Sequence, residues 1–333
     1  MSVRIVFSED ARDFARRDWT AIVDQDPSGT FFHTPGYLKL YWEEFGETPE
    51  HLLFAFAEQG DAQIGAVAFE RFGDTLRFLG GTEVTDYLGP VAIDGSQDAV
   101  AEALFSALAS RDDWRHADLR GLAEDGGWPE RLSAAAVAQG MSVKLGEDQN
   151  GIAPYLPLPS SWEDYLAQLP SKLRHELKRK ARKLESEAGP YTIELSTPES
   201  LEEDLDLFVS LHRSSEGPKG TFMQPGMEIF FRRLGEAFLV DGTFTLSFLQ
   251  IAGVKLAGTI GFRHGGRFLL YNSAFDHEHA WAQLAPGMVL VGEDIRLAID
   301  SGCGGFDMLK GDYAYKYRFG AYKRSVKRLV VDR

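Results

Sequence analysis

Apolar residues recur along the first 150 residues with two spacings, one typical of strands and one typical of helices. Turn residues such as Gln59-Gly60-Asp61 and Phe72-Gly73-Asp74 separate three consecutive strand-like segments, as in β-hairpins. The pattern predicts strands at 3–8, 51–58, 62–71, 74–80, 115–120 and 141–145, and helices at about 10–25, 35–45, 97–110 and 129–139. We therefore expect an α+β arrangement around a three-stranded antiparallel meander.

The second half repeats this order of elements. The pattern predicts a strand at 191–196, helices at 201–214 and 227–239, strands at 243–251, 254–263 and 267–275, a helix at 286–302, and strands at 305–307 and 325–332. Both halves follow the order β-α-α-β-β-β-α-β, and such repetition indicates two copies of one unit. A coincidental match between two α+β halves is the alternative. We expect domains at 1–150 and 151–333.

A basic helix opens the second half and has no counterpart in the first. It follows a linker rich in Pro and Ser at 154–161, and we expect it at 171–188. Its apolar residues form one stripe: Leu173, Leu177, Ala181 and Leu184. Between Lys172 and Lys183, seven basic residues and one Glu give a charge of +6. Such a helix presents either a solvated charged face or a site for an anionic ligand.

The composition is that of a folded, acidic chain. Hydrophobic residues make up 44% of the 333 residues and charged residues 26%, which excludes a disordered or collagen-like protein. The net charge of -15 argues against binding nucleic acid or an anionic membrane except through a local basic patch.

Cys303 is the single cysteine, which excludes an internal disulfide and suits a reducing compartment. The N-terminal residues lack the apolar segment of a signal peptide, and no apolar run approaches the ~20 residues that span a bilayer. We therefore expect a cytoplasmic protein without a transmembrane segment.

Four segments carry a family resemblance. They are the basic stretch 171–184, Ala285-Pro286-Gly287-Met288-Val289-Leu290 before an amphipathic helix, the stretch 306–320, and Thr85-Asp86-Tyr87-Leu88-Gly89-Pro90 in the first half. Together with the order of elements they resemble a tandem duplication of the GNAT acyltransferase fold, in the group of Fem-like (FemAB-type) aminoacyltransferases and CelD-like acetyltransferases. The long helical arm of several Fem proteins has no counterpart here, which weakens the inference of a transfer-RNA donor.

The resemblance implies a donor site for an acyl-CoA. In the GNAT arrangement the strand at 267–275 offers backbone N–H groups to the acyl group, and the helix that begins at Pro286 offers its N-terminus to a pyrophosphate. The implied donor-binding residues are Ala274, Phe275, Pro286, Gly287 and Met288. The phosphate-binding Gln/Arg-x-x-Gly-x-Gly/Ala run of ordinary GNAT enzymes is absent, and the segment 283–287 stands in its place. A Pro-Gly turn that only starts a core helix is the alternative.

Candidate catalytic groups cluster after the short strand at 305–307. Tyr315 could protonate the leaving group, Lys310 or Lys316 could bind a phosphate or carboxylate, and Asp307 could orient a lysine or act as a base. An ion-pair network that only pins this loop is the alternative. No metal site is expected, because His277 and His279 lack an evident third ligand.

Candidate acceptor-binding residues come from three segments: Asp86 and Tyr87, Arg174 and Lys178, and His212 and Arg213. The family counterpart of the basic helix contacts an anionic acceptor, and arginine forks match phosphate. A structural histidine and a turn-capping aspartate are the alternatives for His212 and Asp86. The residues at 310–333 carry another +6, which leaves -27 for the rest of the chain.

The resemblance implies an N-acyltransferase, in particular an acetyltransferase, that uses acetyl-CoA or another acyl-CoA and no metal. The acceptor would be an amine of an amino sugar or amino acid on an anionic carrier, in cell-envelope or exopolysaccharide biosynthesis. The domain at 1–150 would lack a donor site. Two alternatives stay open: a Fem-like aminoacyltransferase that uses aminoacyl-tRNA, and a non-catalytic protein that binds or assembles anionic glycans.

Overall fold

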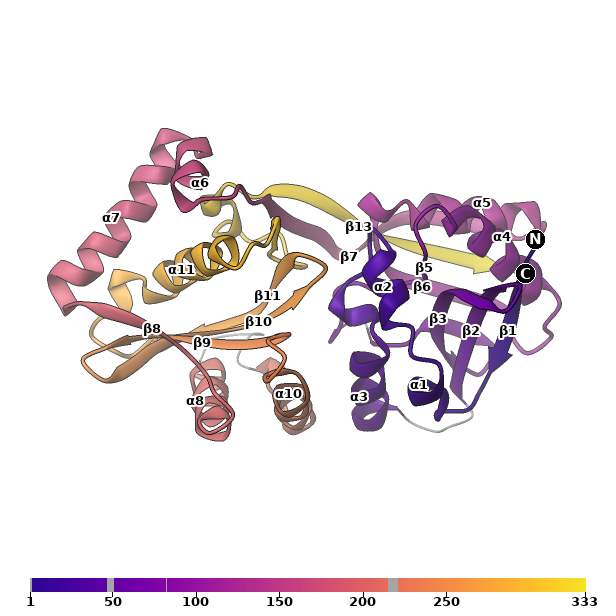
Figure 1. The fold of residues 1–333 in the computed structure, drawn as a ribbon, viewed down its shortest axis with the longest axis horizontal. Helices are drawn as coiled ribbons and strands as arrows, with labels where there is room; N and C mark the ends of the chain where they lie inside the picture. The colour runs from indigo at the N-terminus through magenta and orange to yellow at the C-terminus, as the bar shows by residue number, and fades with distance from the viewer. Residues whose placement is uncertain (1, 47–50, 82, 215–220) are drawn as a thin grey trace. The chain divides into compact units, whose positions relative to one another are not determined.

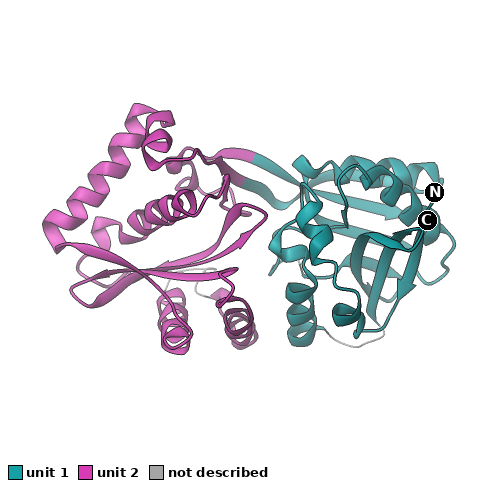
Figure 2. Ribbon diagram, in the orientation of Figure 1, with its two compact units in different colours: residues 1–153, 324–333 teal, residues 154–323 magenta. Residues whose placement is uncertain are grey.

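The computed structural model describes residues 2–46, 51–81, 83–214 and 221–333 (Figure 1). They form two compact units: residues 1–153 with 324–333 make unit 1, and residues 154–323 make unit 2 (Figure 2). Both units combine a sheet with packed helices, which confirms the predicted α+β class. The C-terminal ten residues belong to unit 1, whereas the sequence had placed them in the second domain.

The sheet of unit 1 contains the predicted meander. Its strands are β1 (Val3–Ser8), β2 (Leu52–Gln59), β3 (Ala62–Phe72), β4 (Thr75–Phe78), β6 (His116–Ala123) and β13 (Tyr322–Asp332), in that spatial order. The short β5 (Val91–Ala92) pairs with β3. Pairing is antiparallel except between β4 and β6. β7 (Ser142–Pro157) begins in unit 1 and ends in unit 2.

Helices enclose the core of unit 1. They are α1 (Asp13–Arg16), α2 (Thr20–Gln25), α3 (Pro35–Phe45), α4 (Gln97–Ala109) and α5 (Trp128–Ala138), with single turns η1 (Phe31–His33) and η3 (Glu124–Gly126). Thr34 caps α3 by accepting the N–H of Tyr37, and Pro35 occupies the first turn. α4 and α5 pack on each other, and α4 contacts β1 and β2. The predicted helix at 10–25 is thus two short helices.

Unit 2 has a six-stranded sheet. Its order is the end of β7, then β12 (Gly305–Asp307), β11 (Arg267–Phe275), β10 (Val254–His264), β9 (Phe244–Ile251) and β8 (Tyr191–Leu195). Only the pair β11 and β12 is parallel in this set. The bounds of β11 are those that the sequence predicts.

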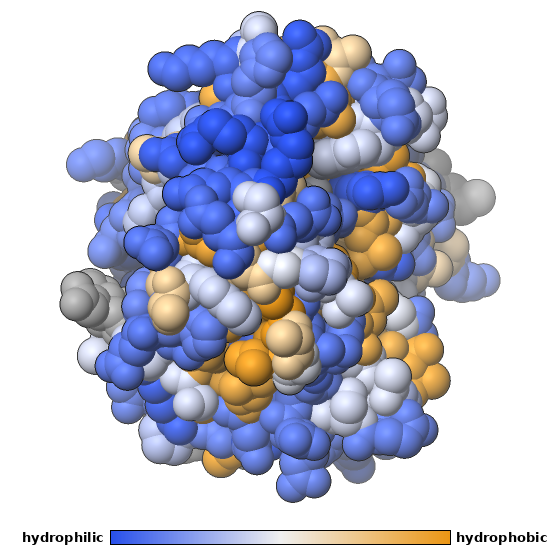
Figure 3. Space-filling model, turned by 90° about the vertical axis from the view of Figure 1, so that its left-hand side faces the viewer, coloured by the Kyte–Doolittle hydropathy of each residue, from blue (hydrophilic) through white to orange (hydrophobic). Residues whose placement is uncertain are grey.

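Helices cover both faces of this sheet. α8 (Leu201–Arg213) and α10 (Pro225–Phe238) lie on one face, and α11 (Pro286–Asp300) lies on the other with α6 (Trp162–Gln168) and α7 (Ser171–Ala188) beside it (Figure 1). The face of the molecule at the left of Figure 1 is hydrophilic in its upper part, where α7 lies (Figure 3). The single turn η4 (Ala282–Leu284) precedes α11 in the chain, and the single turn η5 (Lys316–Phe319) precedes β13.

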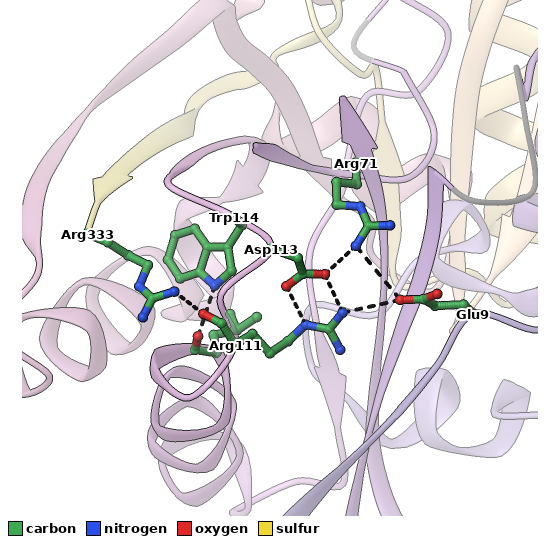
Figure 4. Close-up of polar contacts among 7 residues, drawn as sticks. Glu9, Arg71, Arg111, Asp113, Trp114 and Arg333 are labelled. Carbon is green, nitrogen blue, oxygen red and sulfur yellow. Dashed lines mark hydrogen bonds and ion pairs between the residues drawn. The ribbon is translucent and has the colours of Figure 1, made fainter. Parts of the chain in front are cut away.

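The C-terminal residues are fixed to unit 1. β13 pairs with β6 from Val326 to Asp332, and its side chains at Leu329 and Val331 are completely buried in the core of unit 1. Arg333 donates to the carbonyls of Ala109 and Arg111 beside an ion-pair network of Glu9, Arg71, Arg111 and Asp113 (Figure 4). The order of elements along the chain does not reveal this pairing, so the predicted domain 151–333 includes residues 324–333, which belong to unit 1.

Candidate active site

The parallel strands β11 and β12 separate after three paired residues. Arg267–Leu269 pairs with Gly305–Asp307, and β11 then continues alone on this side to Phe275. Ile260 pairs with Asn272 and Gly261 with Leu270, so Tyr271 is the extra residue of a β-bulge. A bulge bends its strand and increases its twist. In the described part of unit 2, the segment 270–275 therefore has backbone groups on one edge that β12 does not bind.

Tyr315 lies against this segment. Its side chain is partly buried on the core that contains Leu270, and it hydrogen-bonds with Ser273. Burial raises the pKa of Tyr315 to about 12, although the bond with Ser273 acts in the opposite direction. The phenol is therefore protonated at neutral pH. It carries a proton beside the segment where β11 has left β12.

Lys316 points away from solvent and holds the neighbouring turn. It is 4% exposed, and its Nζ donates to the carbonyls of Met308, Leu309 and Lys310 at 2.6, 2.9 and 2.8 Å. An ammonium has three N–H bonds, so these carbonyls account for its donors. This geometry favours a structural role for Lys316.

Asp307 and Lys310 belong to the same turn. Asp307 is 1% exposed, and its carboxylate accepts the N–H of Leu309, whose φ is 57°. The left-handed conformation of Leu309 reverses the chain directly after β12. Lys310 is half-buried, and its carbonyl accepts a hydrogen bond from Nζ of Lys316.

The first turn of α11 packs closely against the end of β11. Ala285 has φ 58° and ψ 53°, and Pro286 fills the first turn. A Cβ at Gly287 would lie 3.4 Å from the ring of Phe275, so the last residue of β11 packs against the first turn of α11. A 15-residue helix offers a partial positive charge at its N-terminus. Ala274 is buried in the sheet, and Met288 is partly buried nearby.

The acceptor-binding candidates lie in different surroundings. His212 on α8 is buried, and its Nε2 lies 3.0 Å from Oδ1 of Asn272, which also accepts the N–H of Ser273. His212 is thus connected through Asn272 to the residue that bonds Tyr315. Arg213 instead binds Glu228 and the carbonyl of Met223, so it ties α8 to α10.

Asp86 and Tyr87 belong to unit 1, whereas the other predicted site residues belong to unit 2. Tyr87 is 2% exposed, and its hydroxyl accepts a hydrogen bond of 2.6 Å from Arg324. Arg324 also pairs with Asp125 at 2.7 Å. The structure therefore gives Tyr87 a packed position inside unit 1.

A pocket of about 480 Å³ lies between α6, α7 and α11. Its basic lining residues are His175, Lys178, Lys180 and Arg182. Arg174 is half-buried and points its guanidinium toward the carbonyl of Leu166 at 3.5 Å, outside this lining. Of the two candidates on the basic helix, Lys178 therefore lines the pocket and Arg174 does not.

The site residues predicted from the sequence do not include Asn272, Ser273 or the pocket residues Trp162 and Arg182. A signal for the first two was present, because Asn272 and Ser273 are polar residues within the mostly apolar strand at 267–275. Periodicity could not reveal the pocket, because the pocket forms only where α6 and α7 pack against α11. Among the residues that the structure describes, no group of three or more His, Cys, Asp or Glu is arranged to hold a metal. None of their helices is long and apolar enough to cross a membrane.

Comparisons with known proteins agree with this geometry. Residues 171–317 match the family described as an acetyltransferase (GNAT) domain, and no curated protein matches the chain. The structure of FemX is 12% identical with a TM-score of 0.67, covering 99% of this chain and 97% of FemX. A conserved protein of unknown function from Bacteroides thetaiotaomicron VPI-5482 is 16% identical with a TM-score of 0.66, covering 99% and 100%. L-PGS from Bacillus licheniformis is 13% identical with a TM-score of 0.55, covering 90% and 92%.

At these identities the likeness to solved structures is one of fold. The separated strand pair, the start of α11 and the matched domain define an acyltransferase fold. Residues 171–317 match a GNAT acetyltransferase domain and the chain shares its fold with FemX, in agreement with the resemblance that the sequence predicted.

Proposed function

We propose that unit 2 is an N-acyltransferase that moves an acyl group, most simply acetyl, from acyl-CoA to an amine of an anionic acceptor. The observation that carries the proposal is the position of Tyr315 on the separated segment of β11, where it bonds Ser273. The start of α11 next to Phe275 supports a donor with phosphate groups.

The reaction follows from these residues. The acceptor nitrogen forms a bond to the acyl carbon, and the bond from that carbon to sulfur breaks. Backbone N–H groups of β11 stabilise the charge that develops on the acyl oxygen. Tyr315 gives its phenolic proton to the leaving sulfur, the amine releases one proton to water, and water returns one proton to Tyr315.

For the acceptor, we propose an amino sugar or amino acid on an anionic carrier, such as those of cell-envelope or exopolysaccharide synthesis, in the cytoplasm. His212 and Asn272, on the α8 side of β11, are the residues proposed to border it. Unit 1 would contribute no donor site.

Aminoacyl transfer is a second candidate. The fold shared with FemX and the basic helix α7 favour it, since a transfer RNA is a polyanion. Retention of transfer RNA by the purified protein at low salt, with loss at high salt, would support this candidate.

The direct test measures binding and turnover with the purified protein. Calorimetry with acetyl-CoA should show saturable binding, and an amine panel should yield thiol release with an acylated product seen by mass spectrometry. Absence of both signals would reject the acyl-CoA proposal.

Replacing Tyr315 tests the role of its proton. Tyr315→Phe should lower kcat by about 100-fold and leave the KM for acyl-CoA nearly unchanged, because general acid catalysis contributes about 10² to 10⁴. Tyr317→Phe is the matched control, because Tyr317 lies in the same loop and binds Asp312 instead. Equal kcat values for Tyr315→Phe and the wild type would exclude this role.

A further inference from the structure

The pocket between α6, α7 and α11 combines an apolar interior with cationic groups. Trp162, Leu166, Leu177 and Met288 supply apolar surface, and Lys178 and Arg182 come from one side of α7. Glu293 on α11 is the acidic group of the lining, and it accepts a hydrogen bond of 2.8 Å from Tyr191. A ligand that fits must therefore carry an apolar part, an anion and a hydrogen-bond donor.

Two of the cations at this pocket, Lys178 and Arg182, are not paired with a carboxylate in the part of the chain that the structure describes. Neither Lys178 nor Arg182 forms an ion pair with any residue in the described ranges. Burial lowers the pKa of Lys180, and the charge of Arg318 acts in the same direction against the opposing effect of Glu176. A bound anion would relieve this crowding of cations.

The pocket lies directly along α11 from the candidate pyrophosphate site. Met288 belongs to both, since it follows Gly287 and also lines the pocket. From Gly287 to Gly292 the helix rises about 7.5 Å, at about 1.5 Å per residue. That length is of the order of the separation between a pyrophosphate and the base of the same nucleotide.

The volume is compatible with a nucleoside. Pockets for small ligands measure about 300–1,000 Å³, and this one measures about 480 Å³. Gly292 lines it, and a Cβ there would meet no atom nearer than 4.0 Å, which belongs to Phe319. The helix face is therefore open at this position.

We propose that this pocket binds the 3′-phosphoadenosine end of the acyl-CoA donor. The indole of Trp162 offers adenine a stacking surface, Lys178 and Arg182 bind the 3′-phosphate, and Glu293 accepts from the ribose or the adenine amino group. This inference rests on the proposed function, and it assigns Lys178 to the donor instead of the acceptor.

The charge arm of the test uses calorimetry with CoA, 3′-dephospho-CoA and adenosine 3′,5′-bisphosphate. The double variant Lys178→Gln/Arg182→Gln should bind CoA and the bisphosphate about tenfold or more weakly, since each charged hydrogen bond contributes appreciably. Its affinity for 3′-dephospho-CoA should change much less. Arg179→Gln is the control, because Arg179 lies on the same helix outside the lining, and it should bind all three ligands like the wild type.

The steric arm fills the pocket. Gly292→Leu should abolish binding of the bisphosphate, whereas Gly292→Ala should reduce it only slightly, because the position has room for a Cβ. Circular dichroism and thermal unfolding check that each variant folds. If Gly292→Leu does not fold, the charge arm decides.

The outcomes separate this inference from the proposed function. Wild-type binding of CoA with no effect of the Lys178, Arg182 and Gly292 variants overturns the pocket and leaves the acyltransferase proposal intact. Variant-sensitive binding of the bisphosphate without acyl transfer supports the pocket and rejects the acyltransferase. Failure of the wild type to bind both CoA and the bisphosphate overturns both. A short RNA ending in adenosine that displaces the bisphosphate more strongly than CoA does would overturn CoA as the ligand.

Discussion

At the scale of single residues, Asp294 shows what burial does to a carboxyl group. It is completely buried on the face of α11 that packs against the sheet, and the hydroxyls of Ser247 and Thr259 each donate to it at 2.8 Å. Burial raises the pKa of Asp294 to about 6, although both hydroxyls favour the charged form. Two neutral donors do not replace the hydration that a carboxylate loses.

This shift predicts a pH-dependent stability. The folded-state pKa lies above the unfolded value of 3.8, so the unfolded state releases the proton first as pH rises. Asp294 therefore costs nothing below about pH 4, destabilises the fold increasingly up to about pH 6, and costs about 3 kcal/mol above that.

The measurement compares urea unfolding of the wild type and Asp294→Asn between pH 4 and 8. The free energy of unfolding of the variant should rise relative to the wild type by about 3 kcal/mol across this range. Asp300→Asn, at the exposed end of the same helix, should give a constant difference. Parallel curves for Asp294→Asn and the wild type would contradict the assignment.

At the scale of elements, α7 is held to α11 by a small apolar contact. Leu184 is completely buried with Leu290 and Val289 of α11, whereas most of the helix is polar. Leu184→Ala should lower the free energy of unfolding by about 2–5 kcal/mol and increase hydrogen exchange at 181–188. Leu195→Ala, at an exposed position of β8, should change neither. Unchanged exchange in α7 would show that other contacts hold it.

Periodicity located elements that bury one face and missed those held mainly by backbone pairing. The strands β10 and β11 bury apolar side chains, so their predicted bounds agree with the structure to within one residue. The segment 146–151 is polar and glycine-rich, so it resembles a loop, yet it belongs to the 16-residue strand β7. Backbone hydrogen bonds do not depend on side-chain type.

The same limit applies to the site. The sequence placed Tyr315 and Lys316 in one loop but could not assign them different roles, because the turn at Leu309 decides where each side chain points. It found α7 from its charge and could not find the pocket, which needs two other helices.

At the scale of the whole molecule, basic residues of the C-terminal segment form ion pairs inside unit 1. Arg324 pairs with Asp125, Lys327 with Glu147, and Arg328 with Asp118. Three of the eight basic residues at 310–333 are thus paired with carboxylates of unit 1. On α7, Lys178 and Arg182 form no ion pair with the residues that the structure describes, so this helix can concentrate an anionic ligand.

The path of β13 predicts that unit 1 depends on the last residues of the chain. A chain that ends at Lys323 loses the pairing with β6 and the completely buried side chains of Val326, Leu329 and Val331. At about 1.5–3 kcal/mol for each side chain, the loss is comparable to the stability of a whole domain. Unit 1 should unfold at lower temperature and become sensitive to trypsin, while residues 154–323 should stay resistant and keep their affinity for CoA.

Two comparisons make this prediction specific. A chain that ends at Asp332 loses only the contacts of Arg333 with the carbonyls of Ala109 and Arg111, so it should unfold within a few degrees of the wild type. A peptide of residues 322–333 added to the shortened chain should restore protease resistance in unit 1, because β13 pairs with β6 as a separate strand. Equal digestion of both units in the shortened chain would mean that β13 stabilises them together, and the division of the chain at Arg324 would then have no energetic meaning.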